Sequence, residues 1–235
     1  MQFYSLYQSE ECIILFYNPV GNVYNFILYL TVGTCEQHSL HLPLNSDTLV
    51  SEKMALDVSE ETGILIAPTI TYGINLPCDI VYSGTTTTTE NALREQVMSI
   101  LSWWKQQGFR QFYALSAHGD PIHLKALREA DKGDFMVFEL YDVEMEDLLE
   151  KQKFTRHADE AETSVIMYLF PEKVRKDKIV DFETPSEEFM DYLYHRKTDP
   201  ILHSPGCQGY PSFATSEKGE AIYNRMKKRV LKSVA

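Results

Sequence analysis

Residues 36–47, with the sequence EQHSLHLPLNSD, contain two carboxylic acids and two histidines shortly after an apolar run. A second polar segment, SAHGDP at residues 116–121, adds His118 and Asp120 after another apolar run. Carboxylates and imidazoles are the groups that bind zinc, manganese or iron(II) in proteins, and one carboxylate can bridge two ions. The one nearby thiol, Cys35, is too few for a thiolate site. These residue types therefore predict a site for divalent metal ions.

A third polar segment lies further along the chain, in RHADEAETSVIMYLFPEKV. His157 and Glu162 stand five residues apart there, at the start of an apolar helical pattern. Acidic residues favour the first turn of a helix because of the helix dipole, so the spacing alone indicates an ordinary helix N-terminus. For the histidines outside the three segments, a structural hydrogen-bonding role is the simpler interpretation; these are His123, His195 and His203.

The apolar runs that precede the polar segments have the length of buried strands, and turn residues bound each one. We expect strands at residues 13–17, 26–33, 63–70, 112–115 and 135–140. Strands that alternate with helices indicate parallel pairing, so the predicted fold is α/β, a three-layer αβα sandwich with a mostly parallel central sheet. Ligands bind outside the carboxyl ends of such strands. The strands at 26–33 and 112–115 would therefore bring their polar segments to one edge.

Helix signals fill the segments between these strands. The predicted helices begin near residues 47, 87, 120 and 216, and the first, second and last of them end near residues 62, 108 and 232. Thr87 opens a TxxE capping box, and Gly63 and Gly108 supply stop signals. Residues 195–211 contain three prolines and two glycines and read as a long loop, either a lid or an oligomer contact.

The composition limits which class of protein this is and which partners it can bind. The 235 residues, 44% of them hydrophobic, suffice for one domain over residues 1–235. A net charge of -12, from 22 Lys+Arg and 34 Asp+Glu, argues against a nucleic-acid partner, which requires clustered cations. Four scattered cysteines without CxxC spacing indicate a reducing, cytoplasmic location. Polar and turn residues interrupt the longest apolar stretch, and the opening residues lack a signal-peptide pattern, so we expect no membrane partner.

A fourth segment, GCQGYPSFATSEKG at residues 206–219, precedes the last predicted helix. Together the four segments resemble, in order, the motifs of the creatininase (creatinine amidohydrolase) family. The first is similar to EQHGPHLPLxxD, with Ser39 and Leu40 in place of Gly-Pro; the second is similar to NGHGGN or GHYEN, and the third, HADEAETS, to HAxxxETS. The resemblance runs from about residue 26 to the C-terminus. Four motifs in one order are a specific signal, although each alone is weak.

This resemblance implies a metal-dependent hydrolase that acts on a non-peptide C–N bond of a small-molecule amide. It also implies two divalent ions, zinc or manganese with iron possible, and a homohexamer built from dimers. By position, one ion would be held by Glu36, Asp47 and His118, and the other by His38 and a bridging Asp47. Two carboxylates remain open as the last ligand of the second ion, Asp120 and Glu162.

The resemblance also assigns roles beside the metal ligands. His157 would donate a proton to the departing nitrogen, and Glu162 is its catalytic partner in the third motif. Gln37 and His41 would orient ligands, although a purely structural role for His41 stays open.

Two departures from the family pattern bear on the substrate. The family segment YGxSxEHxxFPGT reads YGINLPCDIVYSGT at residues 72–85, without the histidine and the proline. The only tryptophans, Trp103 and Trp104, precede the second motif, whereas creatininase places its substrate tryptophans just ahead of the third. Creatinine itself is therefore not the expected substrate. The alternatives are a formamide, a peptide or a ring ketone cleaved at the same site, or a non-catalytic oligomeric family member.

Overall fold

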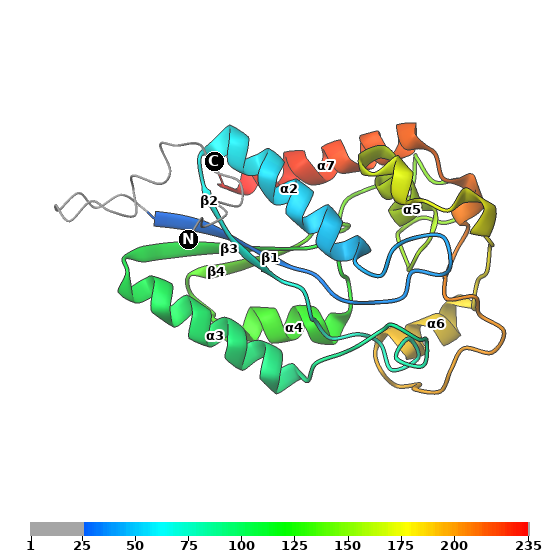
Figure 1. Cartoon of the computed structure of the whole chain (residues 1–235), viewed down its shortest axis with the longest axis horizontal. Helices are drawn as coiled ribbons and strands as arrows, with labels where there is room; N and C mark the ends of the chain where they lie inside the picture. The colour runs from blue at the N-terminus through cyan, green and yellow to red at the C-terminus, as the bar shows by residue number, and fades with distance from the viewer. Residues whose placement is uncertain (1–25, 235) are drawn as a thin grey trace, which may run out of the picture.

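A four-stranded parallel sheet forms the centre of the protein (Figure 1). The computed structural model describes residues 26–234, so the predicted strand at residues 13–17 lies outside the described residues. The strands follow the order β2-β1-β3-β4. Their bounds are Phe26–Val32 for β1, Leu65–Ile70 for β2, Phe109–Ser116 for β3 and Phe135–Glu139 for β4. All three pairings are parallel, as predicted from the alternation of strands and helices.

Helices cover both faces of the sheet. The α-helices are α2 (Ser46–Thr62), α3 (Glu90–Gln106), α4 (Pro121–Ala130), α5 (Glu160–Leu169), α6 (Ser186–Leu193) and α7 (Ser216–Val234). Short 3-10 helices lie at Pro171–Lys173, Lys176–Lys178 and Pro211–Phe213. In Figure 1, α2 and α7 lie above the sheet and α3 and α4 below it. The predicted three-layer αβα sandwich is therefore confirmed.

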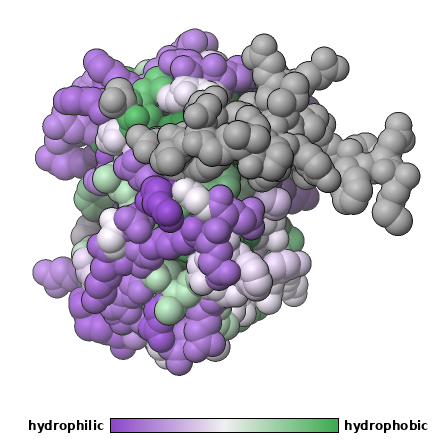
Figure 2. All heavy atoms as spheres, turned by 90° about the vertical axis from the view of Figure 1, so that its left-hand side faces the viewer, coloured by the Kyte–Doolittle hydropathy of each residue, from purple (hydrophilic) through white to green (hydrophobic). Residues whose placement is uncertain are grey.

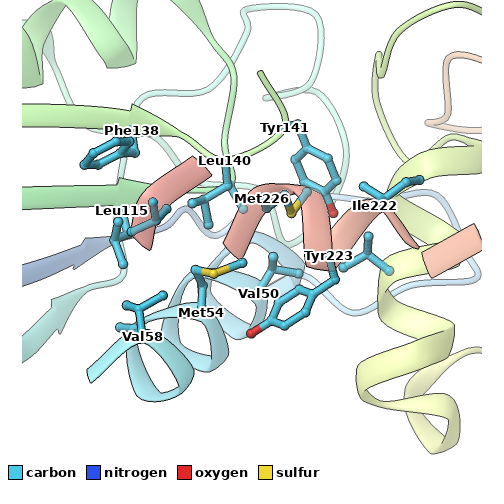
Figure 3. Packing of buried hydrophobic residues seen from close by; sticks show 14 of the residues in the cluster. Val50, Met54, Val58, Leu115, Phe138, Leu140, Tyr141, Ile222, Tyr223 and Met226 are labelled. Carbon is cyan, nitrogen blue, oxygen red and sulfur yellow. The ribbon is translucent and has the colours of Figure 1, made fainter. Parts of the chain in front are cut away.

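Each face of the sheet has its own apolar core, because successive residues of a strand point to opposite faces. Tyr29 of β1 packs with the residues of α2 and α7, whereas Leu28 and Leu30 pack with those of α3 and α4. Figure 3 shows the first core, in which Met54 of α2 and Met226 of α7 belong to the same buried cluster as Leu115 and Phe138 of the strands. Both methionines are fully buried. These two cores fix the positions of the loops that follow the strands.

The predicted helix starts and stops agree with the structure at most helix ends and differ from it at one. Gly63 ends α2 in the left-handed conformation with φ 70°, and Asp120 caps α4 with its side chain. The cap of α3 was predicted at Thr87, which is wrong by two residues. Thr89 caps the helix and accepts from the backbone N–H of Ala92 at 3.2 Å. Thr87 is unavailable because its hydroxyl accepts from a backbone N–H of the preceding loop.

The two ends of the sheet differ in what they present. Figure 2 looks onto the end where the strands begin, and its coloured surface is mainly hydrophilic. The carboxyl ends of the strands point to the opposite end, toward α5 and α6 (Figure 1). Within residues 26–234, no helix combines the length and the apolar character that crossing a lipid bilayer demands.

Candidate metal centre

The predicted ligands meet beyond the carboxyl ends of β1 and β3. These strands are neighbours in the sheet, so the loops that follow them leave at the same edge. The β1 loop carries Glu36 and His38, and the β3 loop carries His118. Asp47 lies in the first turn of α2, where its Oδ2 accepts from the Thr34 hydroxyl at 2.7 Å. All four of these ligand candidates are buried, with at most 6% of each residue exposed.

One group of potential ligands joins the two loops through His118. Its Nδ1 lies 3.1 Å from Glu36 Oε2 and 3.4 Å from Asp47 Oδ2. The other ring nitrogen, Nε2, donates to the carbonyl of Ile74 at 2.8 Å. This second hydrogen bond leaves the Nδ1 lone pair facing the two carboxylates, which is how metal-binding histidines are usually oriented. Glu36, Asp47 and His118 can therefore bind one divalent ion.

A second group shares Asp47 with the first. His38 Nε2 lies 3.4 Å from Asp47 Oδ1 and 3.7 Å from Glu162 Oε2. The Nδ1 of His38 donates to the Glu36 carbonyl at 3.1 Å, so Nε2 points to the carboxylates. The two oxygens of Asp47 thus face different histidines, as expected of a carboxylate that bridges two ions. His38, Asp47 and Glu162 form the second potential ligand set.

Two buried atoms in these groups have no hydrogen-bond partner within residues 26–234, namely Glu36 Oε2 and His38 Nε2. Buried polar atoms are rarely left unsatisfied because desolvation without a partner is costly. Electrostatics agree. Burial acts to raise the pKa of Asp47, but the neighbouring imidazoles of His38 and His118 outweigh burial and lower the pKa well below its usual value. Burial acts to lower the pKa of His38, yet Asp47 and Glu162 raise it to about 10. Both shifts show that the carboxylates of this site favour positive charge beside them.

The two open candidates for the second set differ in their surroundings. Asp120 Oδ1 accepts from the backbone N–H of Ile122 at 2.6 Å and of His123 at 3.2 Å. Its Oδ2 accepts from His195 Nε2 at 2.9 Å. Both oxygens are therefore engaged, and Asp120 belongs to none of the potential ligand groups found among the described residues. Glu162, in contrast, lies within reach of His38. The structure favours Glu162, and it gives His195 a partner that the sequence did not indicate.

His157 lies beside both ligand groups. Its Nε2 donates to the Gln37 carbonyl at 2.7 Å, and its Nδ1 lies 3.9 Å from Glu36 Oε1. The ring centroid is 4.6 Å from that of His38. Ala158, the next residue, has φ 45°, a left-handed turn that lets the chain pass from His157 into the cap of α5.

Burial raises the pKa of Glu162 to about 7, despite the opposing charges of His38 and His157. One of its oxygens, Oε2, accepts from the backbone N–H of Ala158 at 2.6 Å. The first turn of α5 therefore holds this carboxyl close to His157, so the third sequence segment contributes more to the site than an ordinary helix N-terminus would.

Gln37 and the loop after α6 hold the β1 loop in place. Gln37 Nε2 donates to Asp79 Oδ1 at 2.8 Å and to the Gly206 carbonyl at 2.7 Å, and its Oε1 accepts from the Ser39 N–H. Gly206 has φ 101°, and a Cβ there would lie 2.0 Å from Gln37 Oε1. Only glycine allows the backbone of residue 206 to lie this close to Gln37. The hydrogen bonds of Gln37 agree with its predicted orienting role. Within residues 26–234, the His41 ring contacts Thr163 Oγ1 at 2.9 Å and makes no hydrogen bond to a candidate ligand.

A cavity of about 290 Å³ opens onto these groups. Besides Glu36, His118, His157 and Glu162, it is lined by residues that the sequence did not indicate as site residues, among them Asp79, Tyr141, Arg156 and Gln208. Asp79 and Gln208 belong to residues 72–85 and 195–211, the two segments that set this chain apart from the family pattern or form its long loop. Nothing in the spacing of Tyr141 or Arg156 could have indicated their position.

Comparison with known proteins gives the same family. A family model described as creatininase, creatinine amidohydrolase, matches residues 24–234. The chain is 27% identical over 219 residues to a creatinine amidohydrolase of Pseudomonas putida, which covers 83% of this chain and 84% of that protein. It is also 27% identical over 191 residues to a 3-dehydro-scyllo-inosose hydrolase of Thermotoga maritima, covering 76% of this chain but only 61% of that protein. A mycofactocin precursor peptide peptidase of Mycolicibacterium smegmatis is 27% identical over 217 residues, covering 85% of this chain and 81% of that protein.

Solved structures share the fold. A crystal structure of creatinine amidohydrolase superimposes with a TM-score of 0.71 at 23% identity, covering 89% of each chain. A manganese form of creatininase gives a TM-score of 0.73 at 21% identity, covering 89% of this chain and 90% of that one. The family match spans nearly all of the described residues, and its relatives are hydrolases. The chain is therefore a member of the creatininase family of amidohydrolases.

Proposed function

We propose that this protein is a dinuclear metal-dependent amidohydrolase that cleaves a C–N bond of a small cyclic amide or a related amide. The observation that carries the proposal is the position of Asp47. Its two oxygens face His118 and His38, which belong to two separate ligand sets, and the buried atoms Glu36 Oε2 and His38 Nε2 lack partners within the described chain. Two divalent cations would satisfy these atoms.

The donor set fits zinc or manganese, and iron is possible, because all ligands are carboxylates or imidazoles. Glu36, Asp47 and His118 would hold one ion, and His38, Asp47 and Glu162 the other. When bound, the ions supply Lewis-acid activation of water and of the carbonyl to be attacked. Solved structures of manganese and zinc forms of creatininase support this choice of metals.

His157 is placed to deliver a proton to the departing nitrogen. Its Nε2 is fixed by the Gln37 carbonyl, so Nδ1 is the atom that faces Glu36 and the cavity. Burial acts to lower the pKa of His157, but the carboxylate of Glu36 outweighs burial and raises the pKa above its usual value, which favours the protonated ring. Such a general acid contributes about 10² to 10⁴ in rate. The Glu162 carboxyl, with its pKa raised to about 7, suits proton transfer as well as ligation.

The relatives leave several substrates open for the same site. Their names cover creatinine, an inosose and a precursor peptide, so hydrolysis of a peptide or a ring ketone is the second candidate function, with a formamide as a further possibility. A non-catalytic family member is the remaining alternative, motivated by Ser39 and Leu40 in the first motif. The cytoplasmic location, the hexamer and the single domain over residues 1–235 stay predictions.

One experiment separates these functions. Protein reconstituted with zinc or manganese would be assayed against lactams, hydantoins, formamides, short peptides, a ring ketone and creatinine, with bound metal measured by mass spectrometry. We expect about two ions per chain and turnover of a cyclic amide. If the protein binds two ions but turns over only a peptide or a ketone, the substrate class would be a peptide or a ketone in place of a cyclic amide. Near-zero metal after growth with zinc and manganese would contradict the dinuclear site and favour the non-catalytic alternative.

A further inference from the structure

Ile74 lies between two histidines, one from the loop after β3 and one from α4. Its carbonyl accepts from His118 Nε2 at 2.8 Å, and this hydrogen bond leaves His118 Nδ1 free for a metal ion. Its backbone N–H donates to His123 Nδ1 at 3.2 Å. Both histidines are buried, and His123 is 0% exposed. The residue that orients a candidate ligand is therefore itself held by a second imidazole.

The hydrogen bonds of the His123 ring specify its tautomer. A backbone N–H can only donate, so the Nδ1 that accepts from Ile74 carries no proton. The proton of the neutral ring then lies on Nε2, which is 3.4 Å from the Ser116 hydroxyl oxygen. That hydroxyl donates to the His118 carbonyl and accepts from the His118 N–H, each at 3.2 Å. His123 thus connects the peptide beside Ile74 with the backbone of the candidate ligand.

The backbone approaches the His123 ring too closely for any side chain at residue 73. A Cβ on Gly73 would lie 2.6 Å from both Cε1 and Nδ1 of His123. On another side, the rings of His118 and His123 meet edge to face, with centroids 5.0 Å apart and an angle of 87° between the ring planes. The His123 ring is therefore confined by the backbone of residue 73 and by the ring of His118.

The segment that contains Ile74 depends on such hydrogen bonds. Residues 72–85 follow β2 and contain no helix or strand. The Gly73 carbonyl accepts from the Thr88 N–H at 2.9 Å, whereas His123 connects Ile74 to α4. Ile74 is 5% exposed, so an apolar residue in place of His123 would leave the Ile74 N–H buried without an acceptor, which is costly. The peptide would then rotate toward another partner, and the carbonyl that orients the candidate ligand would move with it.

We propose that His123 is a positioning residue for the metal ion of the Glu36, Asp47 and His118 set, because it holds the Ile74 peptide that orients His118. The inference rests on the proposed metal centre. Partners of a metal-binding histidine contribute about 10- to 100-fold to metal affinity, and His123 acts one residue further away, so we expect about 10-fold. The other histidine ligand is independent of it, because its Nδ1 donates to the Glu36 carbonyl.

The test measures zinc affinity at each ligand set separately. The full chain would be titrated with zinc against a competing chelator, and the ¹⁵N signals of the His118 and His38 rings would report the two sets by NMR. His123→Leu removes the acceptor for Ile74, while His123→Asn keeps an acceptor oxygen near the place of Nδ1. In His123→Leu we expect about 10-fold weaker binding at His118 and a change of less than about 2-fold at His38. His123→Asn should recover most of the affinity at His118.

Leu127→Ala is the matched control for lost packing. Leu127 is buried in the same helix, α4, and its side chain cannot form hydrogen bonds. This variant should lower the thermal unfolding midpoint and leave zinc binding at both sets unchanged. The inference is overturned by unchanged binding at His118 in His123→Leu, by equal weakening at His118 and His38, or by no recovery in His123→Asn.

A measurement on the unmodified, metal-free protein tests the same contact without a variant that has to fold. The ¹⁵N chemical shifts of the His123 ring distinguish a proton on Nε2 from a proton on Nδ1. We expect the proton on Nε2. A ring with its proton on Nδ1 cannot accept from Ile74, and that result overturns the inference.

Failure of this inference differs from failure of the proposed metal centre. An unmodified protein that binds no zinc would remove the metal centre and, with it, the role of His123. Zinc bound with the same affinity in His123→Leu and in the unmodified protein would leave the metal centre and remove only the role of His123.

Discussion

At the scale of single residues, the proposed metal centre depends most on Asp47. It contributes to both potential ligand sets, and the Thr34 hydroxyl fixes one of its oxygens. Asp47→Ala should therefore lose both ions. Substitution of a residue that belongs to only one ligand set should leave the ion of the other set bound. Mass spectrometry of protein purified with zinc would measure this, with Asp142→Ala as a control that retains metal. Two ions per chain in Asp47→Ala would contradict the bridging assignment.

His157 tests the chemistry separately from metal binding. We expect His157→Ala to retain its metal and to lose about 10² to 10⁴ in kcat, because a general acid of this kind contributes that much. The ring donates to the Gln37 carbonyl, so His157→Gln, whose amide can also donate there, is the positional control. Both variants should have a low kcat if His157 acts by donating a proton. Full activity in His157→Gln would show that the residue only holds the β1 loop.

At the scale of elements, the contact between α5 and α7 positions Glu162. Gly219 of α7 packs against the backbone of Ser164 in α5, and a Cβ there would lie 1.9 Å from the Ser164 carbonyl oxygen. The HADEAETS and ATSEKG segments therefore meet in space, although residues 165–213 separate them in the chain. The glycine allows the two helices to approach closely enough for the first turn of α5 to reach the site.

Gly219→Ala should accordingly destabilise the protein by about 1 to 3 kcal/mol, the usual cost of overpacking. The free energy of unfolding would be measured by urea denaturation. Glu220→Ala, an exposed change on the same helix, is the control and should alter stability by less than about 0.5 kcal/mol. Equal stability of Gly219→Ala and the unmodified protein would show that the helices can separate without cost.

At the scale of the whole molecule, a buried histidine links stability to pH. His41 is fully buried, and burial, followed by the charges of His38 and His157, lowers its pKa to about 4. In the unfolded chain a histidine has a pKa of about 6.5. Between these two values the unfolded chain binds a proton that the folded protein does not, so the free energy of unfolding decreases as the pH falls from about 6.5 toward 4.

The expected loss between pH 7 and pH 5 is about 2 kcal/mol from this residue. Urea denaturation of the metal-free protein at the two pH values would measure it. His41→Gln retains an amide that can contact Thr163 and cannot titrate in this range, so its loss should be smaller by about that amount. An identical pH dependence in the two proteins would mean that His41 is not held neutral.

The sequence by itself determined the layers of the fold, because strand and helix periodicity is local and each apolar face must be buried. It also predicted which candidate ligands lie together, since parallel strands deliver the residues that follow them to one end of the sheet. The comparisons confirm the family that the ordered motifs resemble.

Only the tertiary structure decided which groups touch. Asp120 and Glu162 were equal candidates in the sequence, and the difference between them lies in a hydrogen bond to His195, seventy-five residues away. Asp79 lines the cavity and accepts a hydrogen bond from Gln37, which lies forty-two residues earlier in the chain. Such contacts depend on how whole loops pack over the sheet, and no local pattern of residues encodes that packing.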